Sequence, residues 1–275
     1  SPTSIEEKSE AVIESLVNKL EGKPVLSDNW MIVTANSYAS VAGAKILESG
    51  GTAADAMIAA QAVLGLVEPE SSGLGGGAFL VWYDNNTKKI VTLDGRETAP
   101  LSAESSHFQN EEGEPMKFFD AVVGGLSVGT PAIPALMDTA HKRWGSAEWS
   151  TLFDDAIKLS ENGFSVSAKL AASINRDAER LSTFKTTKDY FLPNGSGLSH
   201  KEIVTNHAYA RTLKLLANSG IDTFYKGEIA SDIIETIKNA NGNRGLLEKI
   251  DLENYKIIEI KAVCIDYKKY DICGM

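Results

Sequence analysis

The sequence predicts a mixed α and β fold in one compact domain, 1–275, and three features support this prediction. A nearly apolar helix is expected at 53–67, shortly before a strand hairpin at 78–93. A mainly helical region is expected at 133–241, and strands with alternating side chains close the chain. With 275 residues, 43% of them hydrophobic, the chain is long enough to bury a sizeable core.

The first thirty residues (1–30) are expected to form a flanking amphipathic helix and a linker. Apolar residues recur at helical spacing from Ile5 to Leu20 among many charges, which is typical of a solvated helix. A short strand is expected at 31–35, and a helix at 37–49 that the pair Gly50-Gly51 ends. Because the chain opens on Ser-Pro-Thr-Ser without an initiator Met, we expect a processed or trimmed product.

The helix at 53–67 is expected to be buried on all sides. Thr52, followed three residues later by Asp55, forms a capping-box start. Only Asp55 and Gln61 interrupt the apolar run, and a helix without a polar face must be covered all round. The sequence Glu68-Pro69 ends it, because proline cannot continue the hydrogen-bond ladder.

The glycine-rich segment 71–77 does not fit a phosphate loop. Such loops follow a strand and open a helix, so that backbone N–H groups and the helix dipole face the anion. Here a helix precedes the loop and a strand follows it, and no Gly-Lys-Ser/Thr sequence comes after the glycines. We therefore exclude nucleotide binding at this loop. The glycines are instead expected to allow close backbone packing beside a site.

The helical region contains several segments with helical periodicity. They lie at 133–144, 150–162, 165–181, 208–218 and 228–240.

Strands are expected at 256–267 and from 270 onward, joined by Lys268-Lys269. If these lysines form a two-residue turn, Cys264 lies opposite Cys273 at a non-hydrogen-bonded position, with Cα atoms about 4.5 Å apart. The same register places Asp266 opposite Asp271, a repulsive pair. Whether the two cysteines are bonded therefore stays open.

Composition excludes several classes of function. The net charge of −10 argues against nucleic acid and acidic membrane surfaces as partners. No apolar run reaches the roughly 18 residues that a membrane span needs. Two cysteines and four scattered histidines show no metal-ligand spacing, so no metal site is expected.

Four motifs resemble the γ-glutamyltranspeptidase family in order and spacing: GGTAADA at 50–56, VEP at 67–69, SGLGGG at 72–77 and LDGRETAP at 93–100. The resemblance implies a four-layer αββα sandwich of the N-terminal-nucleophile hydrolase type, an α/β (α+β) fold of which this chain is the N-terminal portion. It also implies γ-glutamyl transfer and hydrolysis on glutathione-like amides, with autocatalytic cleavage of a zymogen and no cofactor.

The resemblance assigns one substrate-binding residue, Arg96, which would bind the α-carboxylate of the glutamyl group. A guanidinium makes two charge-assisted hydrogen bonds to a carboxylate, which a lysine cannot reproduce. Asp94 and Glu97 are candidates for orienting that guanidinium. Without the resemblance, an arginine after a strand is more often a surface ion pair, and the same two acids would be its partners.

The family's nucleophile is a threonine at the N-terminus of a C-terminal small subunit, so no catalytic residue is expected on this chain. The chain by itself is expected to be inactive, because its last strand breaks off in mid-pattern. The further partners implied are glutathione and an acceptor amino acid, peptide or water, in a periplasmic or extracellular, cell-surface location.

Two alternatives stay open at this point. One is a cephalosporin-type (glutaryl) acylase of the same family, which a comparison of γ-glutamyl with glutaryl amides would separate. The other is a non-catalytic fragment or pseudoenzyme that only binds, which a threonine nucleophile beyond residue 275 would exclude.

Overall fold

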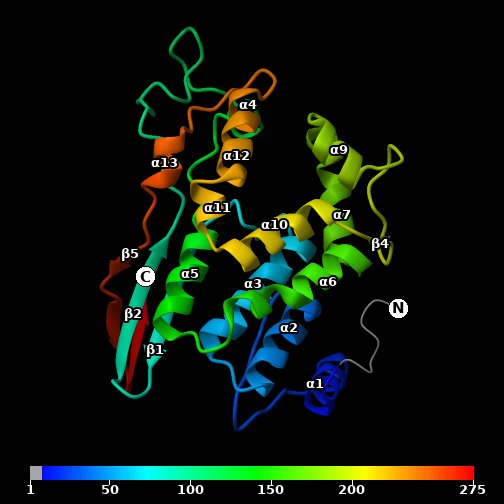
Figure 1. Cartoon of the computed structure of the whole chain (residues 1–275), viewed down its shortest axis with the longest axis vertical. Helices are drawn as coiled ribbons and strands as arrows, with labels where there is room; N and C mark the ends of the chain where they lie inside the picture. Colours follow the sequence, from blue (N-terminus) through cyan, green and yellow to red (C-terminus); the bar gives the residue numbers. More distant parts are fainter. Residues whose placement is uncertain (1–7) are drawn as a thin grey trace. The chain divides into compact units, whose positions relative to one another are not determined.

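A computed structural model describes residues 8–275, which form two compact units. The first unit comprises the chain up to Gly73 together with Ala140–Asn218, and the second comprises Leu74–Thr139 and Ser219–Met275. Each unit thus combines two stretches that are far apart in the sequence (Figure 1). The mixed α and β composition predicted from the sequence is confirmed.

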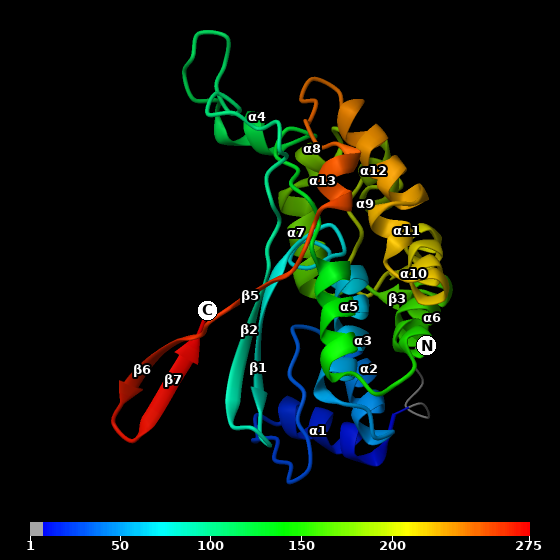
Figure 2. The same cartoon turned by 60° about the vertical axis from the view of Figure 1, so that its left-hand side comes forward.

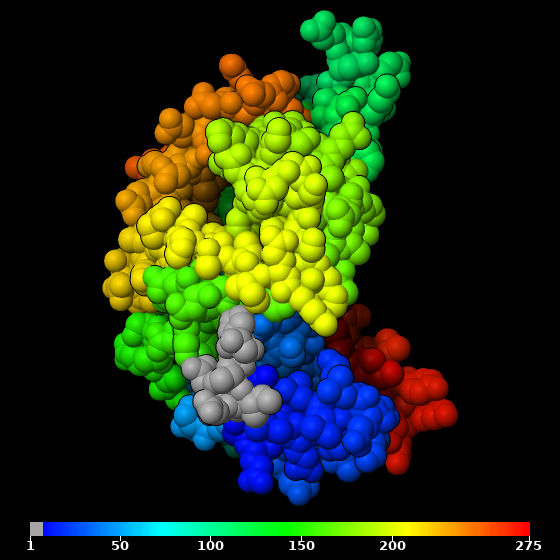
Figure 3. Space-filling view, turned by 90° about the vertical axis from the view of Figure 1, so that its right-hand side faces the viewer, coloured from blue at the N-terminus to red at the C-terminus, as the bar shows by residue number. Residues whose placement is uncertain are grey.

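The first unit is almost entirely helical. Its elements are α1 (Glu10–Leu20), α2 (Ser37–Glu48), α3 (Ala53–Val67), the 3₁₀ helix η2 (Trp149–Phe153), α6 (Asp154–Asn162), β3 (Phe164–Ser165), α7 (Ala168–Arg176), α8 (Ala178–Leu181), α9 (Lys185–Phe191), β4 (Ile203–Val204) and α10 (His207–Ser219). The yellow-green segment that contains α7 to α9 lies on the outer surface of this unit (Figure 3). Helix α5 (Ile133–Trp144) begins in the second unit and ends in the first.

Helix α3 has the predicted bounds and the predicted capping box. The Thr52 hydroxyl accepts from the Asp55 N–H, and the Asp55 carboxylate accepts from the Thr52 N–H at 2.9 Å. Most of the helix is buried, including Ile58 and Val63 at its centre. The expectation of burial on all sides holds for most of the helix, but a stripe of Ala53, Met57, Gln61 and Leu64 is only partly covered. Glu68 follows the helix as the C-cap.

The Asp55 carboxylate also ties α3 to a segment ninety residues away. It accepts from the backbone N–H groups of Ser146 at 3.0 Å and Ala147 at 3.2 Å, and it is fully buried. Burial alone raises the pKa of Asp55, but the N–H groups of Thr52, Ser146 and Ala147 outweigh it and hold that pKa below its ordinary value. The capping residue is thus also a tertiary anchor.

The second unit is built around a small antiparallel sheet. Its elements are β1 (Ala78–Asp84), β2 (Lys89–Gly95), α4 (Phe118–Val122), α11 (Asp222–Tyr225), α12 (Glu228–Lys238), α13 (Lys249–Glu253), β5 (Ile258–Ile260), β6 (Val263–Tyr267) and β7 (Tyr270–Gly274). The sheet has the order β1-β2-β5, so the hairpin predicted at 78–93 gains a strand from the end of the chain. Figure 1 shows β5 beside β2.

One face of this sheet carries exposed apolar side chains on both outer strands, β1 and β5. Phe79 pairs with Asp94 and Val81 with Thr92, and β5 continues the same rows with Ile258 and Ile260. Alternate side chains of β1 therefore point to one face. The apolar side chains exposed on these strands are Phe79, Val81, Tyr83, Ile258 and Ile260.

The single strand expected at 256–267 is wrong, because two strands with different partners occupy it. Residues 258–260 pair with β2, whereas β6 pairs with β7, and the change falls at Lys261 and Ala262. Figure 2 shows the red β6–β7 hairpin projecting away from the three-stranded sheet.

The predicted register of the last hairpin is confirmed. Tyr267 pairs with Tyr270, and Cys264 lies opposite Cys273. The two cysteines form a disulfide, which answers the question that the sequence left open. The repulsive pair Asp266–Asp271 is present as well, so the register tolerates it.

Other sequence-based expectations need correction. Residues 31–35 form no strand, and the helix expected at 150–162 is a 3₁₀ turn followed by α6. The segment expected at 165–181 is two helices, since α7 ends at Arg176 and α8 follows. Helix α1 begins only at Glu10, after an N-cap at Ser9, and positions 5–7 of the predicted helix lie outside the described residues.

Candidate functional site

Arg96 is the first residue after β2, as the sequence predicted. Gly95 closes the strand opposite Ala78, and the chain then leaves the sheet. The guanidinium Nη1 donates to the Gly77 carbonyl at 3.3 Å, and Nη2 lies 3.2 Å from Glu97 Oε2. The side chain is 53% exposed. Its guanidinium therefore lies at the surface of the second unit, with contacts to two nearby acceptors.

The guanidinium also lies over an aromatic ring of the sheet. Its Cζ atom is 5.8 Å from the centre of the Phe79 ring, within the range of a cation–π contact. Phe79 is itself 54% exposed. Arg96 therefore borders the sheet face on which Phe79 and Val81 are exposed.

The two acidic candidates contact different parts of Arg96. Asp94 Oδ1 accepts from the Arg96 backbone N–H at 2.9 Å, whereas Glu97 pairs with the guanidinium itself. Glu97 is thus placed to orient the charged group, and Asp94 to fix the backbone that carries it. This contact with Glu97 is also the surface ion pair expected for an arginine after a strand.

The glycine loop is packed tightly against this strand end. A Cβ atom at Gly77 would lie 2.6 Å from both Glu97 Oε2 and the Gly95 carbonyl, so only glycine fits without a shift. The Gly76 carbonyl accepts from the N–H groups of Ala132 and Ile133, which precede and open α5. The loop therefore presents the Gly76 carbonyl, an acceptor, to the start of α5. A phosphate loop would instead present backbone N–H donors to the anion.

A cavity of about 890 Å³ adjoins the arginine in the second unit. Arg96, Glu97 and Thr98 line one side of it, and the polar loop that carries His107 and Phe108 lines another. His107 Nε2 is 2.8 Å from the Leu126 carbonyl, which ties that loop to the segment before α5. No motif of the sequence pointed to the place of this loop beside the arginine.

Sequence reasoning also missed Tyr255. Its hydroxyl donates to the backbone carbonyl of Arg96 at 2.8 Å, across 159 positions of the sequence. Tyr255 follows the short helix α13. Neither spacing nor periodicity of the sequence connects it with Arg96. The pairing of β5 with β2 brings the two segments together.

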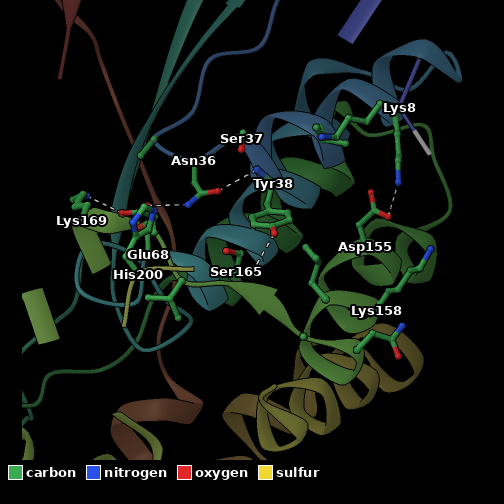
Figure 4. A pocket seen from close by; sticks show the side chains of 18 of the residues that line it. Lys8, Asn36, Ser37, Tyr38, Glu68, Asp155, Lys158, Ser165, Lys169 and His200 are labelled. Atoms are coloured by element: carbon green, nitrogen blue, oxygen red, sulfur yellow. Dashed lines mark hydrogen bonds and ion pairs between the residues drawn. The ribbon is translucent and has the colours of Figure 1, made fainter. Parts of the chain in front are cut away.

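The first unit has a cavity of its own, of about 800 Å³, drawn in Figure 4. Lysines line it, but the structure pairs two of them with carboxylates: Lys169 with Glu68 at 2.7 Å and Lys45 with Asp155 at 2.9 Å. Glu68 is buried and also accepts from Asn36 Nδ2 at 3.0 Å. The hydrogen bond to Glu68 raises the pKa of Lys169.

The Arg96 guanidinium keeps hydrogen-bond donors available in the second unit. A guanidinium has five N–H donors in a planar fork, and the described contacts engage only two acceptors. Among residues 8–275, no group of three or more His, Cys, Asp or Glu side chains is arranged to hold a metal ion. None of the helices in this part of the chain has the length and apolar character that crossing a bilayer requires.

Comparison with known proteins points to one family. The sequence profile of the family described as gamma-glutamyltranspeptidase matches residues 39–275. The glutathione hydrolase proenzyme of Bacillus subtilis (strain 168) is 38% identical over 242 residues, or 88% of this chain and 40% of that protein. This chain therefore spans less than half the length of that curated relative.

Solved structures show the same likeness. The γ-glutamyltranspeptidase of Helicobacter pylori matches 91% of this chain and 70% of its own, with a TM-score of 0.86 and 31% identity. The cephalosporin acylase from Bacillus halodurans matches 86% of this chain and 44% of its own, with a TM-score of 0.74 and 28% identity. The fold class predicted from the motifs, that of the N-terminal-nucleophile hydrolases, is confirmed.

Proposed function

Since this chain belongs to the γ-glutamyltranspeptidase family, as its motifs predicted, we propose that it is the large-subunit part of an enzyme that transfers or hydrolyses γ-glutamyl groups. The proposed substrates are glutathione-like γ-glutamyl amides, with an amino acid, a peptide or water as acceptor. The observation that carries the proposal is Arg96 in the motif LDGRETAP, half-exposed at a strand end and beside a cavity.

In this proposal Arg96 binds the α-carboxylate of the glutamyl group. The carboxylate receives two charge-assisted hydrogen bonds from the planar fork. Glu97 holds one edge of the guanidinium at 3.2 Å, and the Gly77 carbonyl holds another N–H at 3.3 Å. Both contacts are long, so they hold the guanidinium only lightly before substrate arrives.

The bond-breaking group is proposed to lie on a partner chain. In the proposed reaction, the hydroxyl of an N-terminal threonine attacks the γ-amide carbon, and its own α-amine accepts the proton. The α-ammonium gives that proton to the leaving amine, and water or an acceptor amine then attacks the resulting acyl-enzyme ester and releases the threonine hydroxyl. Because the proposed nucleophile belongs to the partner chain, we expect the 275-residue chain by itself not to turn over γ-glutamyl-p-nitroanilide.

The exposed apolar side chains of the sheet support a partner that adds a second sheet. Exposed apolar patches of this kind mark interaction sites in soluble proteins. Such a layer would cover the exposed apolar side chains of β1 and β5, and also the hairpin β6–β7, which exposes Val263, Ile265 and Ile272. Because Arg96 lies over Phe79, substrate bound to it would sit at the edge of that interface.

The proposal is tested by replacing Arg96 in the complete protein. Arg96→Lys keeps the charge but loses the fork, and Arg96→Ala loses both. If the arginine binds the carboxylate equally in ground and transition states, KM rises and kcat changes little. We expect about a tenfold to hundredfold rise in KM for Lys and more for Ala, because each 1.4 kcal/mol is tenfold.

The control is a substrate that lacks only the α-carboxylate, 4-aminobutyryl-p-nitroanilide. Wild type and Arg96→Ala should have nearly equal kcat/KM on it, and self-cleavage should survive in both. A wild-type KM for γ-glutamyl-p-nitroanilide in Arg96→Ala would mean that Arg96 is an ordinary surface ion pair.

The second candidate function, a glutaryl acylase, is favoured by the likeness to the Bacillus halodurans enzyme. A glutaryl amide keeps the terminal carboxylate and lacks only the α-amine, so Arg96 would suit both substrates. Measuring kcat/KM on γ-glutamyl and glutaryl p-nitroanilides side by side distinguishes the two functions. Preference for the glutaryl compound would overturn the transpeptidase assignment while leaving the carboxylate role of Arg96 intact.

A further inference from the structure

The backbone around Arg96 is held by a segment from the far end of the chain. The segment from α13 to β5 runs antiparallel to the segment that leaves β2 (Figure 1). Asp251 Oδ1 accepts from the Leu101 N–H at 2.8 Å, and Asp94 pairs with Ile258. Between these two contacts, the Tyr255 hydroxyl donates to the Arg96 carbonyl.

Tyr255 is itself fixed by a second tyrosine. Its ring stacks on that of Tyr225, with centroids 6.0 Å apart and planes 6° from parallel. The buried Tyr225 hydroxyl donates to the Pro131 carbonyl at 2.9 Å and accepts from the Ala135 N–H at 3.2 Å. The start of α5 therefore holds Tyr225, which in turn provides a flat surface for Tyr255.

The Tyr255 hydroxyl remains a donor over the whole physiological pH range. Burial, with the nearby charges of Asp94 and Glu97, raises the pKa of Tyr255 to about 12. The Arg96 carbonyl can only accept, so the hydroxyl proton is committed to it at 2.8 Å.

Arg96 is thus restrained on both sides of its Cα atom. Its N–H donates to Asp94, and its carbonyl accepts from Tyr255. The side chain itself is only lightly held, at 3.2 and 3.3 Å. The direction in which the guanidinium points therefore depends mainly on its backbone, and a small displacement of a substrate-binding group costs binding and rate.

We propose that Tyr255 is a positioning residue for Arg96, and that Tyr225 is the support on which it stacks. The inference rests on the proposed role of Arg96 in binding the α-carboxylate. Tyr255 touches no substrate; it acts by holding the arginine backbone in the orientation that aims the guanidinium at the carboxylate.

The test compares two matched substitutions, Tyr255→Phe and Tyr225→Phe, in the complete protein. Both keep the stacked rings and remove one hydroxyl. Tyr255→Phe should raise KM for γ-glutamyl-p-nitroanilide about threefold to tenfold with little change in kcat, the size expected for one lost neutral hydrogen bond. It should leave kcat/KM on 4-aminobutyryl-p-nitroanilide unchanged.

Tyr225→Phe should behave in the opposite way. The substitution removes the hydroxyl that bonds the buried Pro131 carbonyl and the Ala135 N–H, so both groups lose their partner and Tm should fall. KM should stay near the wild-type value. In the double variant Arg96→Ala/Tyr255→Phe, KM should match that of Arg96→Ala alone, because the tyrosine acts only through the arginine.

Each outcome decides a separate question. If Arg96→Ala raises KM and Tyr255→Phe does not, the positioning role is wrong and the proposed function stands. If Tyr255→Phe affects both substrates equally, its role is structural. If Arg96→Ala leaves KM unchanged, the proposed function fails, and the positioning role fails with it.

Discussion

Two charged residues of the same fifty-residue stretch, Asp55 and Arg96, have opposite surroundings. Asp55 is fully buried, and three backbone N–H groups and two hydroxyls donate to its carboxylate. Arg96 is half-exposed, and its guanidinium has two described polar contacts, both longer than 3.1 Å. Both residues belong to motifs of the family, yet their environments differ in nearly every respect.

The difference separates a structural charge from one that can bind a ligand. A buried carboxylate needs all its hydrogen bonds, because each unsatisfied one costs free energy. A guanidinium that binds a ligand must keep N–H donors available and remain accessible to that ligand. Glu68 follows the first pattern, since Asn36 and Lys169 satisfy it from two sides.

The largest effect on stability is expected at Asp55. Asp55→Ala removes the acceptor for Thr52, Ser146 and Ala147, so the free energy of unfolding should fall by about 2–4 kcal/mol. Guanidinium unfolding followed by circular dichroism measures it. Asp84→Ala is the control, because that aspartate caps a surface turn and should matter far less. Equal losses in the two variants would contradict the comparison.

A smaller loss is expected where the glycine loop meets the arginine. Gly77→Ala forces a Cβ atom to within 2.9 Å of Arg96 Cα, so the strand end must shift at a cost of about 1–3 kcal/mol. In the complete protein, KM for γ-glutamyl-p-nitroanilide should rise too. Gly75→Ala has no heavy atom within 4 Å of its new Cβ and should change neither quantity.

The free energy of unfolding should depend on acidic pH in the way that the lowered pKa of Asp55 requires. Because folding lowers the pKa of Asp55, its stabilisation is present above the unfolded value of 3.8 and is lost as pH falls through the lower folded value. Asp55→Asn should be less stable at pH 7 and lose less below about pH 4. Unfolding free energies from pH 7 to pH 3 give the difference curve. If wild type and Asp55→Asn lose the same free energy of unfolding between pH 7 and pH 3, other groups cause the acid destabilisation.

The smallest effect on stability is expected at Arg96 itself. An exposed ion pair contributes little, so Arg96→Ala should change the free energy of unfolding by less than about 1 kcal/mol. The same substitution is expected to raise KM more than any other proposed here. A large drop in Tm would show that Arg96 is a structural residue like Asp55, and the comparison would no longer hold.

Much of the site was predictable because its elements are local. The capping box at Thr52 and Asp55, the apolar helix, the hairpin and the arginine at its end all follow from contacts within a few residues. The cysteine register was predictable for the same reason, since a two-residue turn fixes the pairing of both strands. The strand expected at 256–267 was wrong because β2, the partner of its first part, is distant in the sequence. The helices expected at 150–162 and 165–181 were wrong at local breaks within each segment.

By itself, therefore, the sequence determined where Arg96 stands, which helix precedes it and which family its motifs match. Tertiary structure alone decided that Asp55 also binds Ser146 and Ala147, that β5 joins β2, and that Tyr255 holds the Arg96 carbonyl. The physical reason is the distance along the sequence over which each interaction acts. Periodicity, caps and turns act over a few residues, whereas these hydrogen bonds join groups separated by 90 positions or more, and no local preference encodes such a pairing.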